Sequence, residues 1–164
     1  MRMFYSGVII AALLASASQA HSATRAYVLN GLIAGNGLEQ IGQRLRARGD
    51  IVVVGSYTRA DEFAAEACAH RGDRLIVIGH SLGAEAAASV ATQARSCGVR
   101  SVTMIGIDPP KSDAAVKGVG RAVNFVGALA GTISGARNVP TPGYGHMEII
   151  ERPEIQARIL AAAE

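Results

Sequence analysis

A serine stands between two glycines in the segment Gly79-His80-Ser81-Leu82-Gly83, directly after a run of β-favouring aliphatic residues and before an alanine-rich stretch. A serine at such a sharp strand-to-helix turn projects its hydroxyl above a sheet, and the flanking glycines let strand and helix approach closely. The helix N-terminus behind the serine adds backbone N–H donors where an oxyanion would form. The pattern predicts Ser81 as a nucleophile, with a helix-capping serine as the alternative.

A nucleophilic serine requires a histidine base, which follows the serine and the acid along the chain in motifs of this kind. The four histidines of the chain are His21, His70, His80 and His146. Only His146 lies downstream of Ser81, in the loop-like segment Pro142-Gly-Tyr-Gly-His146. By elimination we expect His146 to be the base; a solvated loop histidine is the alternative.

The carboxylate that would orient this base is predicted to be Asp108. It ends the apolar run 101–107 and precedes Pro109 and Pro110, which stop a strand. An aspartate at the carboxyl end of a parallel strand lies in the crevice where open α/β sheets bind ligands, although turns and helix caps also favour aspartate. The competing acids are Asp113, Glu148 and Glu151, and Glu148 is too close to His146 in sequence to orient it easily.

These residues must be positioned by an alternation of strands and helices. The strand patterns cover 26–30, 50–55, 75–78, 101–107 and 121–126, with a further candidate near 135–139. The helical patterns cover 37–48, 60–70 and 82–95, and a closing helix starts at Pro153. Continuous apolar strands are typical of a sheet that helices cover on both faces. This pattern of strands and helices therefore predicts an α/β fold with a doubly wound, mostly parallel sheet.

In these motifs the chain resembles the α/β-hydrolase superfamily, in particular its small lidless bacterial lipases, esterases and thioesterases. The resemblance covers the chain after residue 20 and is carried by the elbow Gly79-His80-Ser81-Leu82-Gly83, by Gly106-Ile-Asp-Pro-Pro110 and by Gly145-His146. It implies the strand order 2-1-3-4-5, numbered by appearance, without the two antiparallel strands that begin the family's sheet. Residues 107–121 leave room for at most one short helix, so no lid domain is expected.

The resemblance also implies an oxyanion hole. The family usually carries His-Gly after the first strand, and the next backbone N–H completes the hole; here the residues are Asn30-Gly31-Leu32. The N–H groups of Leu32 and Leu82 would then share the oxyanion, while a plain strand-ending turn is the alternative. The candidate substrate-wall residues, for which ordinary packing is equally compatible, are Leu32, Ile33, Tyr57 and Tyr144.

The two cysteines, Cys68 and Cys97, are allowed to pair in an exported chain, and two small buried hydrophobic side chains are the alternative. In the resembled family the helices after the second and third strands pack on the same face of the sheet. The resemblance therefore implies a structural Cys68–Cys97 bridge, at the edge of the sheet opposite the active site.

Residues 1–20 combine a basic start, an apolar run over 7–14 and the small-residue pattern Ser18-Gln19-Ala20. This pattern predicts a secretory signal cleaved after Ala20, which leaves one domain over 21–164 in the periplasm or outside the cell. The apolar run is far shorter than the roughly 20 residues of a bilayer span, so no membrane span remains after cleavage. The formal net charge is only +3, and the basic residues are scattered along the sequence, so neither nucleic acid nor an anionic membrane surface is implied as a partner.

Taken together, these residues predict a serine hydrolase that cleaves a small-molecule ester or thioester through an acyl-enzyme on Ser81, without a cofactor or metal. The glycines at 35 and 37 do not complete a dinucleotide fingerprint, and the chain has no tryptophan to form a sugar-stacking platform. Two alternatives stay open: an acyltransferase that uses the same residues, and a hydrolase-fold binding module that has lost its chemistry. The sequence does not indicate any protein partner.

Overall fold

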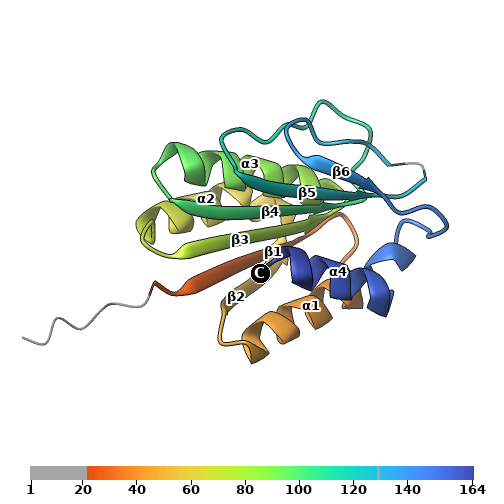
Figure 1. The fold of residues 1–164 in the computed structure, drawn as a ribbon, viewed down its shortest axis with the longest axis horizontal. Helices are drawn as coiled ribbons and strands as arrows, with labels where there is room; N and C mark the ends of the chain where they lie inside the picture. The colour runs from red at the N-terminus through yellow and green to blue at the C-terminus, as the bar shows by residue number, and fades with distance from the viewer. Residues whose placement is uncertain (1–21, 129) are drawn as a thin grey trace, which may run out of the picture.

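The computed structural model describes residues 22–128 and 130–164, so the predicted signal segment 1–20 and His21 lie outside the described residues (Figure 1). Its centre is a six-stranded parallel sheet in the order β2-β1-β3-β4-β5-β6. The strands are β1 (Thr24–Asn30), β2 (Ile51–Ser56), β3 (Arg74–His80), β4 (Ser101–Ile107), β5 (Arg121–Val126) and β6 (Arg137–Pro140). The predicted fold class and the order of its first five strands are confirmed, and β6 extends the sheet beyond β5.

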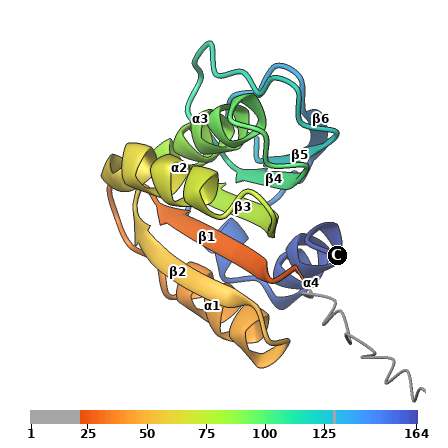
Figure 2. The same cartoon turned by 90° about the vertical axis from the view of Figure 1, so that its left-hand side faces the viewer.

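Helices cover both faces of this sheet. Figure 2 shows α2 (Ala60–Ala69) and α3 (Leu82–Ser96) on one side, and α1 (Asn36–Ala47) and α4 (Pro153–Ala162) on the other. Because successive strand side chains point to opposite faces, Tyr27 and Leu29 of β1 join the core under α2 and α3, whereas Ala26 and Val28 join the core under α1 and α4. The two apolar cores therefore bury both faces of the sheet.

The helices carry apolar residues at the spacing that such layers require. In α1, Leu38, Ile41 and Leu45 are fully buried on one face, and Pro153 occupies the first turn of α4. The alanines of α3 that face the sheet are Ala84, Ala87, Ala88, Ala91 and Ala94, all buried. Small side chains at these positions let α3 lie close to β3 and β4.

The segment 108–120 contains no helix, which is within the expected limit of one short helix, and it is tied to the chain before β6 by an isolated bridge between Ala115 and Ser134. Other local features differ from the expectations. Two 3-10 turns, η1 (Tyr57–Arg59) and η2 (Glu148–Ile150), were not predicted. The third strand was predicted too short, because Arg74 and His80 at its ends interrupt the apolar pattern while still pairing with β4. None of the described helices has the length and apolar character to cross a bilayer.

A disulfide joins Cys68, near the end of α2, to Cys97, which caps α3. Helices in this architecture run antiparallel to the strands, so their C-terminal ends lie at the amino edge of the sheet. The site described next lies at the carboxyl edge. The bridge therefore ties two helices together at the end of the fold that is remote from the candidate site.

Candidate active site

Ser81 occupies a strained turn between β3 and α3. Its φ of 59° and ψ of −129° lie outside the regions that L-residues normally adopt. Its N–H donates to the carbonyl of Ile107 at 2.9 Å, which fixes the turn against β4. A Cβ on Gly79 would lie 1.8 Å from the carbonyl oxygen of Gly83, and one on Gly83 would lie 2.2 Å from the carbonyl oxygen of Leu29. Both flanking glycines are therefore required for this turn.

Asp108 is held directly after β4 on the neighbouring strand. Its N–H donates to the carbonyl of Phe125 at 2.8 Å, and its φ of 49° turns the chain out of the sheet. The carboxylate is only 8% exposed, and its Oδ1 accepts a hydrogen bond of 2.8 Å from the N–H of Gly127. A Cβ on Gly127 would lie 2.4 Å from this oxygen. The position after β5 therefore needs a glycine to hold the acid.

The second carboxylate oxygen, Asp108 Oδ2, lies 2.5 Å from Nδ1 of His146. A carboxylate accepts hydrogen bonds, so we assign the imidazole proton to Nδ1, which leaves Nε2 free to act as a base. The side chain of His146 is 49% exposed, in contrast to its buried acid. This asymmetry suits a buried group that orients a base open to substrate.

His80 is hydrogen-bonded to the backbone of the candidate base, His146. The ring of His80 is 1% exposed, and its Nε2–H donates to the backbone carbonyl of His146 at 2.8 Å. The two imidazole centroids are 4.5 Å apart. Burial lowers the pKa of His80 and outweighs the opposing effect of the hydrogen bond to the His146 carbonyl, and this lower pKa favours a neutral ring. The elbow motif itself assigns no role to His80, and the sequence signal for one is its position at the end of a buried strand beside Ser81.

The three predicted residues open into one cavity of about 340 Å³. Its lining residues are Ser81, Asp108, Pro109, Pro110, Ala128, Tyr144, Gly145 and His146. Ser81 and His146, both among the described residues, have no hydrogen bond between their side chains. Such contacts are commonly long in unliganded enzymes and tighten when substrate binds. The cavity therefore brings together a hydroxyl, an imidazole and a carboxylate with mostly apolar walls.

Of the four predicted substrate-wall residues, one lines the cavity and three do not. Tyr144 lines the cavity, whereas the lining does not include Leu32, Ile33 or Tyr57. The side chains of Leu32 and Ile33 point outward, with 77% and 66% of their area exposed. The backbone of this loop nevertheless approaches the serine, because a Cβ on Gly31 would lie 3.2 Å from Ser81 Oγ.

The proposed oxyanion donors are the backbone N–H groups of Leu82, in the helix that follows Ser81, and of Leu32, in the loop that carries Gly31. Leu82 is the first residue of α3, where N–H groups have no intrahelical acceptor. Leu32 follows Gly31 in the loop after β1. Among the hydrogen bonds of the described residues, the N–H of Leu32 has no acceptor. Both amides therefore remain available to a ligand.

The competing acids make other contacts. Glu148 accepts a hydrogen bond of 3.1 Å from the N–H of Gly145 and pairs with Arg152. It therefore stabilises the loop that carries His146 without contacting the imidazole. Asp113 and Glu151 are exposed. Asp108 is thus the carboxylate that contacts the candidate base.

The group His80, Asp108 and His146 has ligand atoms within 4.8 Å of one another, a spacing that a metal ion could use. Two ligands of a tetrahedral zinc ion, each at about 2.0–2.1 Å from it, lie about 3.3 Å apart. The contact between Asp108 and His146 is 2.5 Å, the distance of a hydrogen bond. Nε2 of His80 is also engaged by a carbonyl. The side-chain arrangement therefore fits proton transfer better than metal binding.

Comparison with known proteins supports the fold assignment. No family model and no curated protein matches the sequence. Among solved structures, the chain is similar to a proposed hydrolase of the α/β superfamily from Xanthomonas campestris pv. campestris, with 15% identity and a TM-score of 0.58. The similarity covers 85% of this chain and 93% of that one. The chain thus has an α/β-hydrolase fold, as its motifs predicted.

Proposed function

We propose that this protein is a serine hydrolase that cleaves a carboxylic ester or thioester through an acyl-enzyme on Ser81. The observation that carries the proposal is the contact of 2.5 Å between Asp108 and His146 in the cavity that Ser81 also lines. A nucleophile, a base and a group that orients the base are the components that acyl transfer requires. The strained elbow adds support, because backbone strain of this kind clusters at functional sites.

In the proposed mechanism, Ser81 Oγ attacks the substrate carbonyl while His146 Nε2 accepts the hydroxyl proton. The negative charge on the carbonyl oxygen is stabilised by the N–H groups of Leu82 and Leu32. His146 then returns the proton to the leaving alkoxide or thiolate, and Asp108 stabilises the imidazolium that forms between these steps. Water, activated by the same imidazole, attacks the acyl-enzyme and releases the acid.

The cavity favours a small neutral acyl group. Its volume of about 340 Å³ is at the lower end for small-molecule pockets, and its walls beyond the three reactive residues are Pro109, Pro110, Ala128, Tyr144 and Gly145. Among residues 22–128 and 130–164, no lysine or arginine lines it to bind an anionic substrate. We therefore expect short, uncharged acyl chains to react faster than long or acidic ones.

Export from the cytoplasm is part of the same proposal. The signal pattern over residues 1–20 predicts it, and the disulfide between Cys68 and Cys97 supports it, because such bonds persist in oxidising compartments. The N-terminal sequence of the protein recovered from its native cell would test this point. A mature chain that begins at His21 is expected, and a chain that keeps residues 1–20 would contradict the proposal.

The proposed function is tested by a fluorophosphonate probe, followed by intact mass measurement. The wild type should gain one adduct, and Ser81→Ala should gain none. Ser89→Ala is a matched control, because Ser89 is an exposed serine of α3 outside the cavity, and it should label like the wild type. Absence of any adduct on the wild type would instead favour a binding module. Product analysis with added alcohol or thiol would then separate hydrolysis from acyl transfer to these acceptors.

A further inference from the structure

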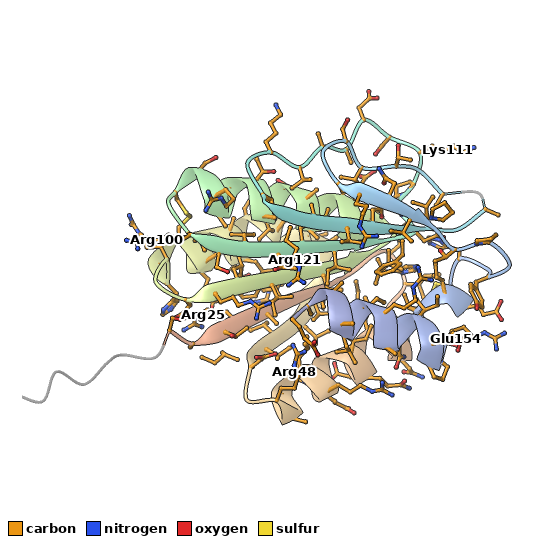
Figure 3. The ribbon with its side chains drawn as sticks, in the orientation of Figure 1. Arg25, Arg48, Arg100, Lys111, Arg121 and Glu154 are labelled. Atoms are coloured by element: carbon orange, nitrogen blue, oxygen red, sulfur yellow. A yellow bond between two sulfur atoms is a disulfide. The ribbon has the colours of Figure 1, made fainter. Side chains whose placement is uncertain are left out.

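A second groove, of about 360 Å³, lies between α4 and the face of β5 and β6 that α4 only partly covers. Its lining residues are Val123, Phe125, Val139, Ala161 and Ala162, together with Arg121, Arg137 and Arg158. None of these residues lines the cavity of Ser81. Figure 3 labels Arg121 in this region, where the sheet faces α4. The groove is therefore separate from the candidate active site.

The three arginines reach the groove from three different elements. Arg121 begins β5 and lies two residues before Val123, so both side chains point to the same face of the sheet. Arg137 begins β6 and pairs in register with Val123. Arg158 of α4 lies over the ring of Phe125, with its guanidinium carbon 5.0 Å from the ring centroid. Residues distant in the sequence thus form one positive rim.

No acidic side chain among the described residues pairs with the arginines of this rim. The arginines that form ion pairs with acidic side chains are Arg25, Arg46, Arg48, Arg59 and Arg152. Within residues 22–128 and 130–164, the side chains of Arg121, Arg137 and Arg158 form neither an ion pair nor a hydrogen bond, and no acidic residue lines their groove. Like charges that share a groove raise its positive potential and attract an anion.

The floor of the groove is apolar. Val123 and Phe125 form its base and are only 6% and 3% exposed, whereas Val139 and Ala162 are half-buried and Ala161 is exposed. A purely ionic ligand would gain nothing from this floor, whereas a hydrocarbon chain would remove apolar surface from water. The volume suits one small molecule and is too small for a polymer.

We propose that this groove binds a small amphiphilic anion, in which a phosphate or carboxylate head is joined to a short hydrocarbon chain. The head would lie among the guanidinium groups of Arg121, Arg137 and Arg158, which donate hydrogen bonds to oxyanions in a planar geometry. The chain would lie along Val139, Ala161 and Ala162, which are the more exposed apolar residues of the groove. This inference does not depend on the proposed hydrolase activity.

The test is a titration of isotope-labelled protein with monomeric octyl phosphate, followed by backbone amide NMR. The signals that shift should belong to β5, β6 and α4. The triple substitution Arg121→Gln, Arg137→Gln and Arg158→Gln should weaken binding by at least about tenfold, because it removes three charge-assisted donors. Its matched control is Arg44→Gln, Arg46→Gln and Arg48→Gln at α1, which removes the same total charge and should leave the affinity unchanged.

Two further ligands test the contributions of the anionic head and of the hydrocarbon chain separately. Inorganic phosphate should bind more weakly than octyl phosphate, and uncharged octyl glucoside should not shift these signals. The proposal is overturned if the triple variant binds octyl phosphate as tightly as the wild type, if inorganic phosphate binds equally tightly, or if the shifts lie elsewhere. The single substitution Arg158→Gln, on the surface of α4, provides the same comparison if the triple variant does not fold.

Discussion

Replacing Asp108 by asparagine should remove nearly all activity while leaving the fold intact. The amide of asparagine has one acceptor oxygen, whereas Asp108 accepts two hydrogen bonds, from the N–H of Gly127 at 2.8 Å and from Nδ1 of His146 at 2.5 Å. The backbone N–H can only donate, so the asparagine oxygen must face Gly127. The amide NH₂ then faces His146 and donates to Nδ1. The imidazole is forced to carry its proton on Nε2, where it cannot accept the proton of Ser81.

The expected changes in kcat and in the free energy of unfolding follow from this forced tautomer. Both hydrogen bonds of the side chain are replaced by others in the same places, and the shape of the side chain is conserved, so the free energy of unfolding should change by less than about 1 kcal/mol. The base is lost, which in comparable triads lowers kcat by about 10⁴-fold. KM should change little, because the side chain orients the base without holding the substrate.

The assay is the hydrolysis of a short-chain p-nitrophenyl ester at saturating concentration, with urea unfolding of the same samples. Asp113→Asn, at an exposed aspartate outside the cavity, is the control for loss of a carboxylate and should keep wild-type kcat. An Asp108→Asn variant that folds normally and retains more than about a tenth of wild-type kcat would refute this tautomer reasoning.

Three further predictions concern the disulfide and His80. The double substitution Cys68→Ala and Cys97→Ala opens a loop with a sequence separation of 29 residues and should lower the free energy of unfolding by about 3.6 kcal/mol, measured by urea unfolding; an unchanged midpoint would contradict it. His80→Phe keeps an aromatic ring beside His146 but loses the donor to its carbonyl, so kcat for ester hydrolysis should fall by about tenfold with KM nearly constant. His80→Gln, which retains a donor, should restore part of the loss, and equal kcat in both variants would exclude this role. Burial lowers the pKa of His80 in the folded state, so below the unfolded pKa of about 6.5 the unfolded chain binds a proton that the folded chain does not. Stability should therefore fall with decreasing pH, by at most about 1.4 kcal/mol per unit from this group, and His80→Gln should flatten that dependence in urea unfolding from pH 7.5 to 5.5.

The sequence predicted those parts of the fold and site that have a local signal. Ser81 lies in a motif whose glycines, strand and helix are contiguous in the chain, and Asp108 follows an uninterrupted apolar strand. The strand order came from the resemblance, and the sheet confirms it. His146 was chosen by elimination among four histidines, and the structure places it against Asp108.

The parts that were missed depend on contacts between distant segments. Gly127 holds Asp108 only because β4 and β5 are neighbours, and nothing local to Gly127 indicates that its N–H has this partner. The basic residues are scattered along the chain. The register of β5 and β6 and the position of α4 nevertheless bring Arg121, Arg137 and Arg158 to one groove. Spacing in the sequence carries no information about such neighbours until the sheet order is known.

The backbone conformation of the two residues at the candidate site lowers the stability of the fold. Ser81 and Asp108 are the residues other than glycine that adopt positive φ within the described chain, and such conformations cost on the order of 1–3 kcal/mol each. Glycine would relieve this cost at the proposed nucleophile, so Ser81→Gly should resist urea better than the wild type while losing the proposed activity. Directed evolution for thermal tolerance alone would then tend to replace Ser81. Any stabilisation campaign on this scaffold must therefore select for turnover in the same round.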